Sequence, residues 1–212
     1  SNDLKISATK KLYLDGGGNT YLHEVSADAV QLVAGGTAVW EIDSNSRVSL
    51  SNNDSGDRNT VFGYGSGANI DSGSDDNTFF GYQVGDATLN DATYNVGIGR
   101  SALGGMTSGD KNTAVGGLAS IGVLTGDGNV FLGYSTGYSV TSGNYNTFVG
   151  TNAGLNLETG SYNTLMGYQA GDSLTTANKN SAFGYQALAA NQTTSNNTAI
   201  GYVAGTLLTN SG

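Results

Sequence analysis

The sequence predicts an all-β protein whose larger part is a β-solenoid of nine stacked coils, and three observations lead to this prediction. An Asn recurs nine times from residue 59 onward, at intervals of 17 or 18 residues. A Gly stands four residues after each Asn without exception, and a short β-branched and aromatic run lies between the two. A period this short leaves little room for two helices and a turn, but it suits one coil of a β-solenoid (β-roll). The repeated residues are Asn59, Asn77, Asn95, Asn112, Asn129, Asn146, Asn163, Asn180 and Asn197, with Gly63, Gly81, Gly99, Gly116, Gly133, Gly150, Gly167, Gly184 and Gly201.

The three residues after each Asn are expected to form a short strand. Counting the Asn as position 0, position 1 is β-branched in eight of nine copies, and positions 2 and 3 are both mainly apolar. Neighbouring residues of a strand point to opposite faces, whereas a single coil has only one interior face. One apolar column must therefore lie outside, as at an interface, so we expect an obligate oligomer. On this interpretation Phe148, at position 2, lies between chains, and Thr151 is exposed away from the contact.

A second apolar position follows each Asn by eleven residues and predicts a second short strand in every coil. In the eighth copy this position is Asn191, which breaks the pattern. In the second copy, where the spacing is 18, the apolar residue is Leu89, one residue later than in the others. Each coil would then consist of two strands and two tight turns, and eight steps of about 4.8 Å would make a shaft of roughly 38 Å. The residues at this position are Ile70, Met106, Val123, Val140, Leu157, Leu174 and Leu208.

The Asn and Gly columns each have a physical explanation. Stacked Asn amides can donate and accept hydrogen bonds along the axis, so that each coil satisfies the next. Alternatively, Asn is present as a turn residue that tolerates left-handed backbone geometry. The Gly column indicates either a positive φ or a close approach of two backbones.

Residues 1–58 lie outside the repeat, and residues 59–212 form the array. Short β-runs at residues 11–14, 20–24, 30–34, 38–42 and 47–50, joined by Gly-rich links, predict β-hairpins. These runs contain too few apolar residues for an ordinary independent core, so we expect this segment also to need partner chains. Residues 51–58 are expected to be a polar linker.

Composition argues against several classes of partner. The net charge is −9 and no basic stripe is present, which speaks against nucleic acid or an anionic membrane surface. No stretch of 18 apolar residues exists, so we expect no membrane insertion. The chain has no Pro, as suits a backbone whose N–H groups are needed in a ladder, and no Cys, which excludes thiolate chemistry.

The array motif resembles a known family of fibre proteins. The motif is clearest in Asn163-Thr164-Leu165-Met166-Gly167-Tyr168-Gln169-Ala170-Gly171 and in Asn197-Thr198-Ala199-Ile200-Gly201-Tyr202-Val203-Ala204-Gly205. It resembles the Asn-Thr-Ala-Ile-Gly-Tyr-x-Ala repeats of bacteriophage tail fibres and, more distantly, the head repeats of trimeric autotransporter adhesins. The segment of residues 11–21, with Gly35-Gly36-Thr37, is also similar to parts of phage tail fibres. This resemblance implies three chains, whereas the residues alone imply only more than one.

Candidate chemistry in the sequence is sparse, and we expect no enzyme activity. His23 is the only His, and a lone His in a hairpin is more often structural than catalytic. Paired carboxylates at Asp75-Asp76, with Asp71, could suggest glycoside hydrolysis, but a solvated loop without aromatic neighbours explains them better. A calcium site is a weaker candidate, and its ligands would be carboxylates of Asp54, Asp57, Asp71, Asp75 and Asp76. Otherwise no cofactor or metal is expected.

A Tyr column directly after the Gly column is the candidate for ligand binding. A row of exposed Tyr could hold sugar rings and so contact a cell-surface glycan or protein receptor, but stacking between coils explains the same pattern without a ligand. Arg100, Gly117 and Thr151 replace Tyr in three copies. The column consists of Tyr64, Tyr82, Tyr134, Tyr168, Tyr185 and Tyr202.

Together these patterns predict a structural and attachment protein. The leading hypothesis is a homotrimeric fibre shaft of a phage tail or phage-like injection device, located on the virion tail or at the extracellular surface and bound to other tail or baseplate proteins. The alternative is a surface adhesin head of the trimeric autotransporter type. An ice-binding solenoid ranks third, because its Thr column lies between Asn and apolar positions.

Overall fold

The structure is a computed structural model of the chain. It describes residues 11–14, 16, 18–26, 29–34, 36–42, 48–49, 56, 58–190 and 192–205. The chain divides into two compact units, Ser1–Asn53 and Asp54–Gly212. The described residues contain no helix.

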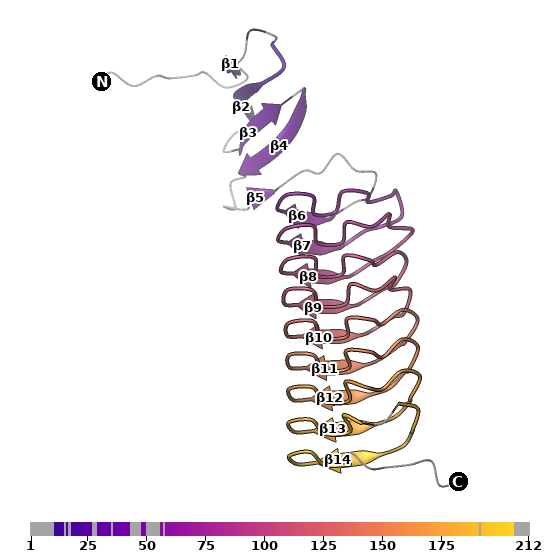
Figure 1. Cartoon of the computed structure of the whole chain (residues 1–212). Helices are drawn as coiled ribbons and strands as arrows, with labels where there is room; N and C mark the ends of the chain where they lie inside the picture. The colour runs from indigo at the N-terminus through magenta and orange to yellow at the C-terminus, as the bar shows by residue number, and fades with distance from the viewer. Residues whose placement is uncertain are drawn as a thin grey trace. The chain divides into compact units, whose positions relative to one another are not determined.

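The first unit is one antiparallel sheet of five strands in chain order, as the Gly-rich links predicted (Figure 1). Strands β2 and β3 pair with a register shift between Glu24 and Ser26, and Val33 of β3 is buried. The predicted hairpins are therefore confirmed, with boundaries that differ from the expected ones by a few residues. The strands are β1 (Lys11–Tyr13), β2 (Tyr21–Ser26), β3 (Ala29–Ala34), β4 (Thr37–Ile42) and β5 (Val48–Ser49).

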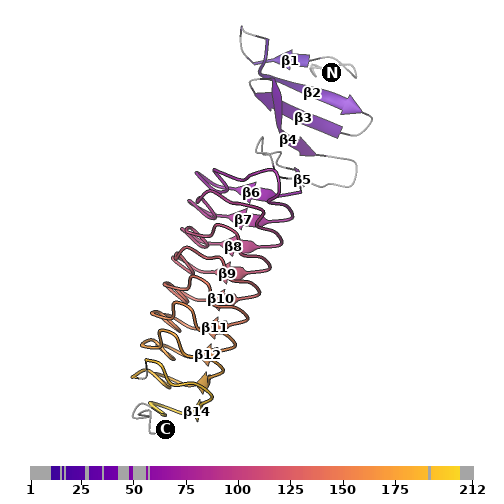
Figure 2. The same cartoon turned by 90° about the vertical axis from the view of Figure 1, so that its right-hand side faces the viewer.

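The second unit is a β-solenoid whose nine strands form one parallel sheet, each strand pairing with those one coil before and after it. Figures 1 and 2 show these strands stacked one below another, with turns leaving the sheet on both sides. Equivalent positions pair throughout, as Phe148 with Leu165 illustrates. The strands are β6 (Thr60–Phe62), β7 (Thr78–Phe80), β8 (Val96–Ile98), β9 (Thr113–Val115), β10 (Val130–Leu132), β11 (Thr147–Val149), β12 (Thr164–Met166), β13 (Ser181–Phe183) and β14 (Thr198–Ile200).

The predicted second strand of each coil is wrong for the described residues, which show turns and bends there. The apolar position eleven after Asn is still part of the core: Met106, Val140 and Leu174 are fully buried. In the fourth copy Val123 instead lies 59% exposed, and the next residue, Leu124, is buried in its place. Hydrophobic spacing therefore identified an inward position, whose backbone curves too tightly to form a strand.

The middle residue of each three-residue strand points into the coil. Phe79, Phe131, Phe148 and Leu165 are fully buried, whereas the residues on either side of them are half-buried or exposed. The expectation that Phe148 lies between chains is thus wrong, because position 2 fills the interior and position 3 is the outer apolar column. Thr151, expected to be exposed, is half-buried.

Core volume is shared between position 2 and position 8 of the same coil. Where position 2 is large, position 8 is Gly, and a Cβ on Gly154 would collide with the Phe148 ring. In the copy that begins at Asn180 the sizes are reversed, since Ala182 faces a coil interior that holds Leu188, and both are fully buried. Small and large residues therefore exchange places without changing the coil.

The invariant Gly column combines two constraints. Its φ angles lie between +122° for Gly99 and +144° for Gly81, a region closed to residues with a Cβ. A Cβ at Gly99 would also lie 2.7 Å from the carbonyl oxygen of Gly116 in the next coil. Both explanations offered by the sequence thus hold together, and this is why no copy departs from Gly.

Left-handed backbone recurs in each array coil at three further positions, where side chains are accepted. The residue before the Asn, position 6 and position 8 have φ near +55°, as in Tyr145, Gln169 and Leu188. That region is strained but open to non-Gly residues. The turns can therefore vary in sequence while the coil keeps its path.

The Asn side chains form a buried ladder along the axis. The Asn77 backbone N–H donates to Asn59 Oδ1 at 2.8 Å, and Asn77 Nδ2 donates to the same oxygen at 3.1 Å and to the carbonyl of Ala92 at 2.8 Å. The pattern continues to Asn197, whose Nδ2 donates to Asn180 Oδ1 at 2.9 Å. The amide-ladder explanation fits these contacts, whereas none of the nine Asn has a positive φ, so the turn explanation fails.

A second ladder, which the sequence analysis missed, runs two residues before each Asn from Asn95 to Asn197. The backbone N–H of Asp110 donates to Asp127 Oδ1 at 2.8 Å, and that of Asp127 to Asn144 Oδ1 at 2.8 Å. The ladder continues through Ser161 to Asn178 at 2.8 Å. Here each side chain accepts from the preceding coil, the opposite sense to the Asn ladder. The signal available in the sequence was a column of Asp, Asn, Ser and Thr at this position.

Candidate functional site

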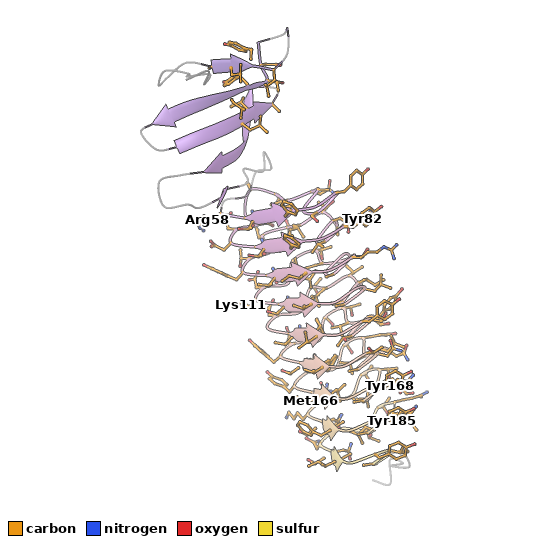
Figure 3. The ribbon with its side chains drawn as sticks, turned by 90° about the vertical axis from the view of Figure 1, so that its left-hand side faces the viewer. Arg58, Tyr82, Lys111, Met166, Tyr168 and Tyr185 are labelled. Carbon is orange, nitrogen blue, oxygen red and sulfur yellow. The ribbon has the colours of Figure 1, made fainter. Side chains whose placement is uncertain are left out.

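The outer face of the nine-stranded sheet is the candidate functional surface. It consists of three columns, at positions 1, 3 and 5, which leave the strands on the side away from the core. Figure 3 shows this face, with Met166 on the strands between Lys111 along one edge and Tyr168 along the other. We call it the strand face.

Position 3 supplies an unbroken apolar column on the strand face. Phe62 and Phe80 are each 53% exposed, and their rings stack at 5.0 Å between centroids. Val115, Val149 and Phe183 are half-buried in the single chain. Because position 2 is the only strand position that faces the coil interior, nothing inside the coil accounts for this column. It consists of Phe62, Phe80, Ile98, Val115, Leu132, Val149, Met166, Phe183 and Ile200.

The strand face carries almost no charge. Position 1 is Thr, Val or Ser in all copies, and among positions 1, 3 and 5 the only charged residue is Arg100. Other charges of the array, such as those of Glu158 and Asp172, lie in the turns outside this face. The apolar column is thus bordered by neutral hydroxyl and Tyr side chains.

Within the Tyr column, neighbouring rings stack on one another. Tyr168 and Tyr185 are 5.3 Å apart at 12° between ring planes, Tyr185 and Tyr202 are 5.2 Å apart at 10°, and Tyr64 and Tyr82 are 5.7 Å apart at 16°. Stacking covers both flat faces of Tyr185 and one face of each of the other rings in these pairs, whereas Tyr134 has Gly117 and Thr151 as its neighbours in the column. A sugar ring that packs on an aromatic ring needs a free face, so this geometry supports the structural interpretation of the column.

A second set of exposed rings, missed in the sequence, occupies the left-handed position before the Asn. Tyr94, Tyr145 and Tyr162 are each 57–58% exposed, and the last two stack at 5.5 Å. Lys111 and Lys179 hold the same position in other copies. The signal was the residue directly before each Asn, which varies in type because side chains such as Tyr145 and Lys179 project into solvent at this position.

The acidic residues of the first coils are engaged in local contacts. Arg58 donates to Asp76 through Nε at 2.7 Å and Nη2 at 2.8 Å. These hydrogen bonds, with a smaller contribution from Tyr94, lower the pKa of the Asp76 carboxyl, and the Ser74 hydroxyl likewise lowers the pKa of Asp71. The expectation of a loop without aromatic neighbours is therefore wrong at Asp76, because Tyr94 is close enough to contribute to the lowered pKa of its carboxyl.

Metal and catalytic candidates are not brought together in the described part of the chain. No group of three or more His, Cys, Asp or Glu side chains there is arranged to hold a metal ion. Asp54 and Asp57, named as candidate calcium ligands, lie outside the described residues. His23 pairs with Lys11 across strands β1 and β2, and its side chain is not among those described.

Comparisons with protein-family models, with curated proteins and with solved structures gave no match to this chain. Within the described residues no helix has the length and apolar character needed to cross a membrane.

Proposed function

We propose that this chain is a structural and attachment protein, a shaft segment of a homotrimeric fibre on a phage tail or a phage-like injection device. The observation that carries the proposal is the uninterrupted bonding of each coil to the next. Backbone pairing, the Asn ladder and the second polar ladder all run parallel to the axis, so that load along the stack is shared at every coil. The resemblance of the array motif to tail-fibre repeats supports the same function.

Such a shaft needs no pocket, because its role depends on length and stiffness. Sequence variation is accepted in the turns, where residues such as Tyr145 and Lys179 project outward without disturbing the ladders. Variable outward turns on a constant core suit a fibre whose sides meet different surroundings. Other tail or baseplate proteins would bind at its ends.

Immunogold electron microscopy tests this proposal in the organism that carries the gene. Antibodies raised against the array should label fibres on tailed particles released after induction, and a strain lacking the gene should give particles without label. Label on the surface of intact, uninduced cells would overturn the proposal in favour of the adhesin alternative. Absence of label on any particle, with the protein present in the lysate, would also overturn it.

Receptor binding by the Tyr column is tested by replacing Tyr168 and Tyr185 together by Ala. Because these two rings already cover one another, we expect no difference between the purified variant and the wild type in a fluorescence assay of binding to host cells. The matched control replaces Tyr145 and Tyr162, the stacked pair on the other edge of the face. A drop in cell binding of roughly tenfold for the first pair alone would show that the column contacts a receptor.

A further inference from the structure

We propose that the strand face is the contact surface between copies of this chain, with the apolar column of one chain packing in register on that of the next. The inference deepens the proposed function, since it names the surface that assembles the shaft. It places the contact on position 3, and specifically on residues such as Met166. It excludes Phe148 and the other position-2 residues, which the fold has already buried.

The size of the exposed apolar surface exceeds what a lone chain needs. Leu132, Met166 and Ile200 are 46%, 42% and 73% exposed, and six Tyr of the adjoining column are 43–79% exposed. With aromatic side chains of roughly 150–250 Å² each, about half exposed, the face presents on the order of 1,000 Å² of largely apolar surface. That is above the roughly 800 Å² that each partner contributes to a standard protein interface.

The neutrality of the face restricts its occupant. Across three columns and nine coils the only charge is that of Arg100, whereas the chain as a whole carries −9. Two copies that met through their turns would bring carboxylates together, but two copies that meet through the strand face bring together Thr, aliphatic and aromatic side chains. Self-association through this face therefore escapes the repulsion that net charge imposes elsewhere.

The regular spacing of the column favours a second copy over an unrelated partner. Its side chains recur at the spacing of paired strands, about 4.8 Å, over nine coils, and a partner must match that spacing to pack against all of them. This chain supplies the matching surface itself. Three or more copies related by rotation about an axis along the stack must all run in the same direction. Equivalent coils of the copies then lie at the same level along that axis. Met166 then lies opposite Met166 of a neighbouring copy.

Cysteine cross-linking tests both the surface and the register, because the chain contains no Cys. Met166→Cys should form covalently linked chains on mild oxidation or with a short bis-maleimide, seen on a denaturing gel without reductant. Thr159→Cys, on an exposed turn of the preceding copy and only seven residues earlier in the chain, is the matched control and should stay unlinked. Equal yields of linked chains for the two variants would overturn the proposal.

Mixing two variants distinguishes parallel from antiparallel packing. Tagged Met166→Cys chains, co-expressed with Ile98→Cys chains, should link only to their own kind when equal coils meet. Linked mixed pairs in excess of like pairs would mean that the seventh coil meets the third, as in an antiparallel dimer, and would overturn the in-register arrangement.

A charge substitution tests the contact without cross-linking. Met166→Asp should weaken self-association by roughly a hundredfold, measured by sedimentation, while circular dichroism shows an intact sheet. Thr159→Asp should leave the mass of the assembly, measured in the same way, equal to that of the wild type. A wild-type chain that is a folded monomer would overturn the interface and the homotrimer, and would leave the labelling experiment to decide whether the chain is part of a phage fibre. Conversely, antibody label on the surface of uninduced cells, together with cross-linking of Met166→Cys chains, would overturn the proposed phage fibre and support the interface.

Discussion

Gly150→Ala is expected to lower the free energy of unfolding of the array by about 4 kcal/mol. Gly150 has φ +124°, and a Cβ there would lie 2.6 Å from the carbonyl oxygen of Gly167 in the next coil. The coils cannot separate to make room, because the Gly167 N–H donates to Val149 at 2.8 Å. Chemical unfolding followed by circular dichroism measures the loss, and hydrogen exchange locates the coils that open.

The matched control for this substitution is Asn152→Ala, two residues further along the same turn. Asn152 has φ +59°, in the left-handed region that non-Gly residues can enter. Replacing it should cost about 1 kcal/mol, from the backbone preference alone. Equal losses for the two variants would mean that the close approach to Gly167 is not what requires Gly at position 4.

Phe148→Ala and Gly154→Leu should each destabilise the array strongly, and together they should largely restore it. Alone, Phe148→Ala leaves a cavity that costs about 3–5 kcal/mol. Alone, Gly154→Leu drives a side chain into the Phe148 ring, at a cost of about 3 kcal/mol or more. The double variant recreates the combination of Ala182 and Leu188 that the eighth coil already uses.

A double-mutant cycle in equilibrium unfolding measures this compensation. We expect a favourable coupling of about 3 kcal/mol or more, because the two side chains compete for one volume. The control combines Phe148→Ala with Gly171→Leu, where the added Leu would meet Leu165 of another coil and cannot fill the space left by Phe148. Rescue by the control as well would mean that core volume is shared along the stack and not within one coil.

The period and the identity of the repeated residues determined the fold class. Asn at one level and Gly four residues later can recur nine times only if equivalent atoms of successive coils meet, as Asn146 Nδ2 and Asn129 Oδ1 do at 3.0 Å. A contact that recurs between successive coils requires the same residue in each coil, so the repeat in the sequence predicts the stacking directly. The hairpins of the first unit were likewise readable, because Gly-rich links separate runs with strand propensity.

Other features depended on backbone angles that residue types do not reveal. The sequence showed two adjacent apolar positions but could not tell which one faces inward, and it suggested Phe148 for the contact between chains that we propose at Met166. It also predicted a second strand at Met106 and its equivalents, where an apolar residue is buried by a turn. An apolar position predicts that a side chain is buried. Whether the residue lies in a strand depends on how tightly the backbone curves between buried positions.

The sequence by itself determined that this protein is a stack of nine short coils held at an Asn and a Gly column. Only the tertiary structure decided which side of the strands is the core and which side lies open, because that choice depends on the left-handed residues before the Asn and at positions 6 and 8, which turn the chain back on itself. Tyr145, Gln169 and Leu188 occupy such positions, and outside position 8, which is Gly in six of nine copies, no common residue type marks them. The apolar strand face is therefore a property of the folded coil, which places position 2 inside and leaves position 3 exposed.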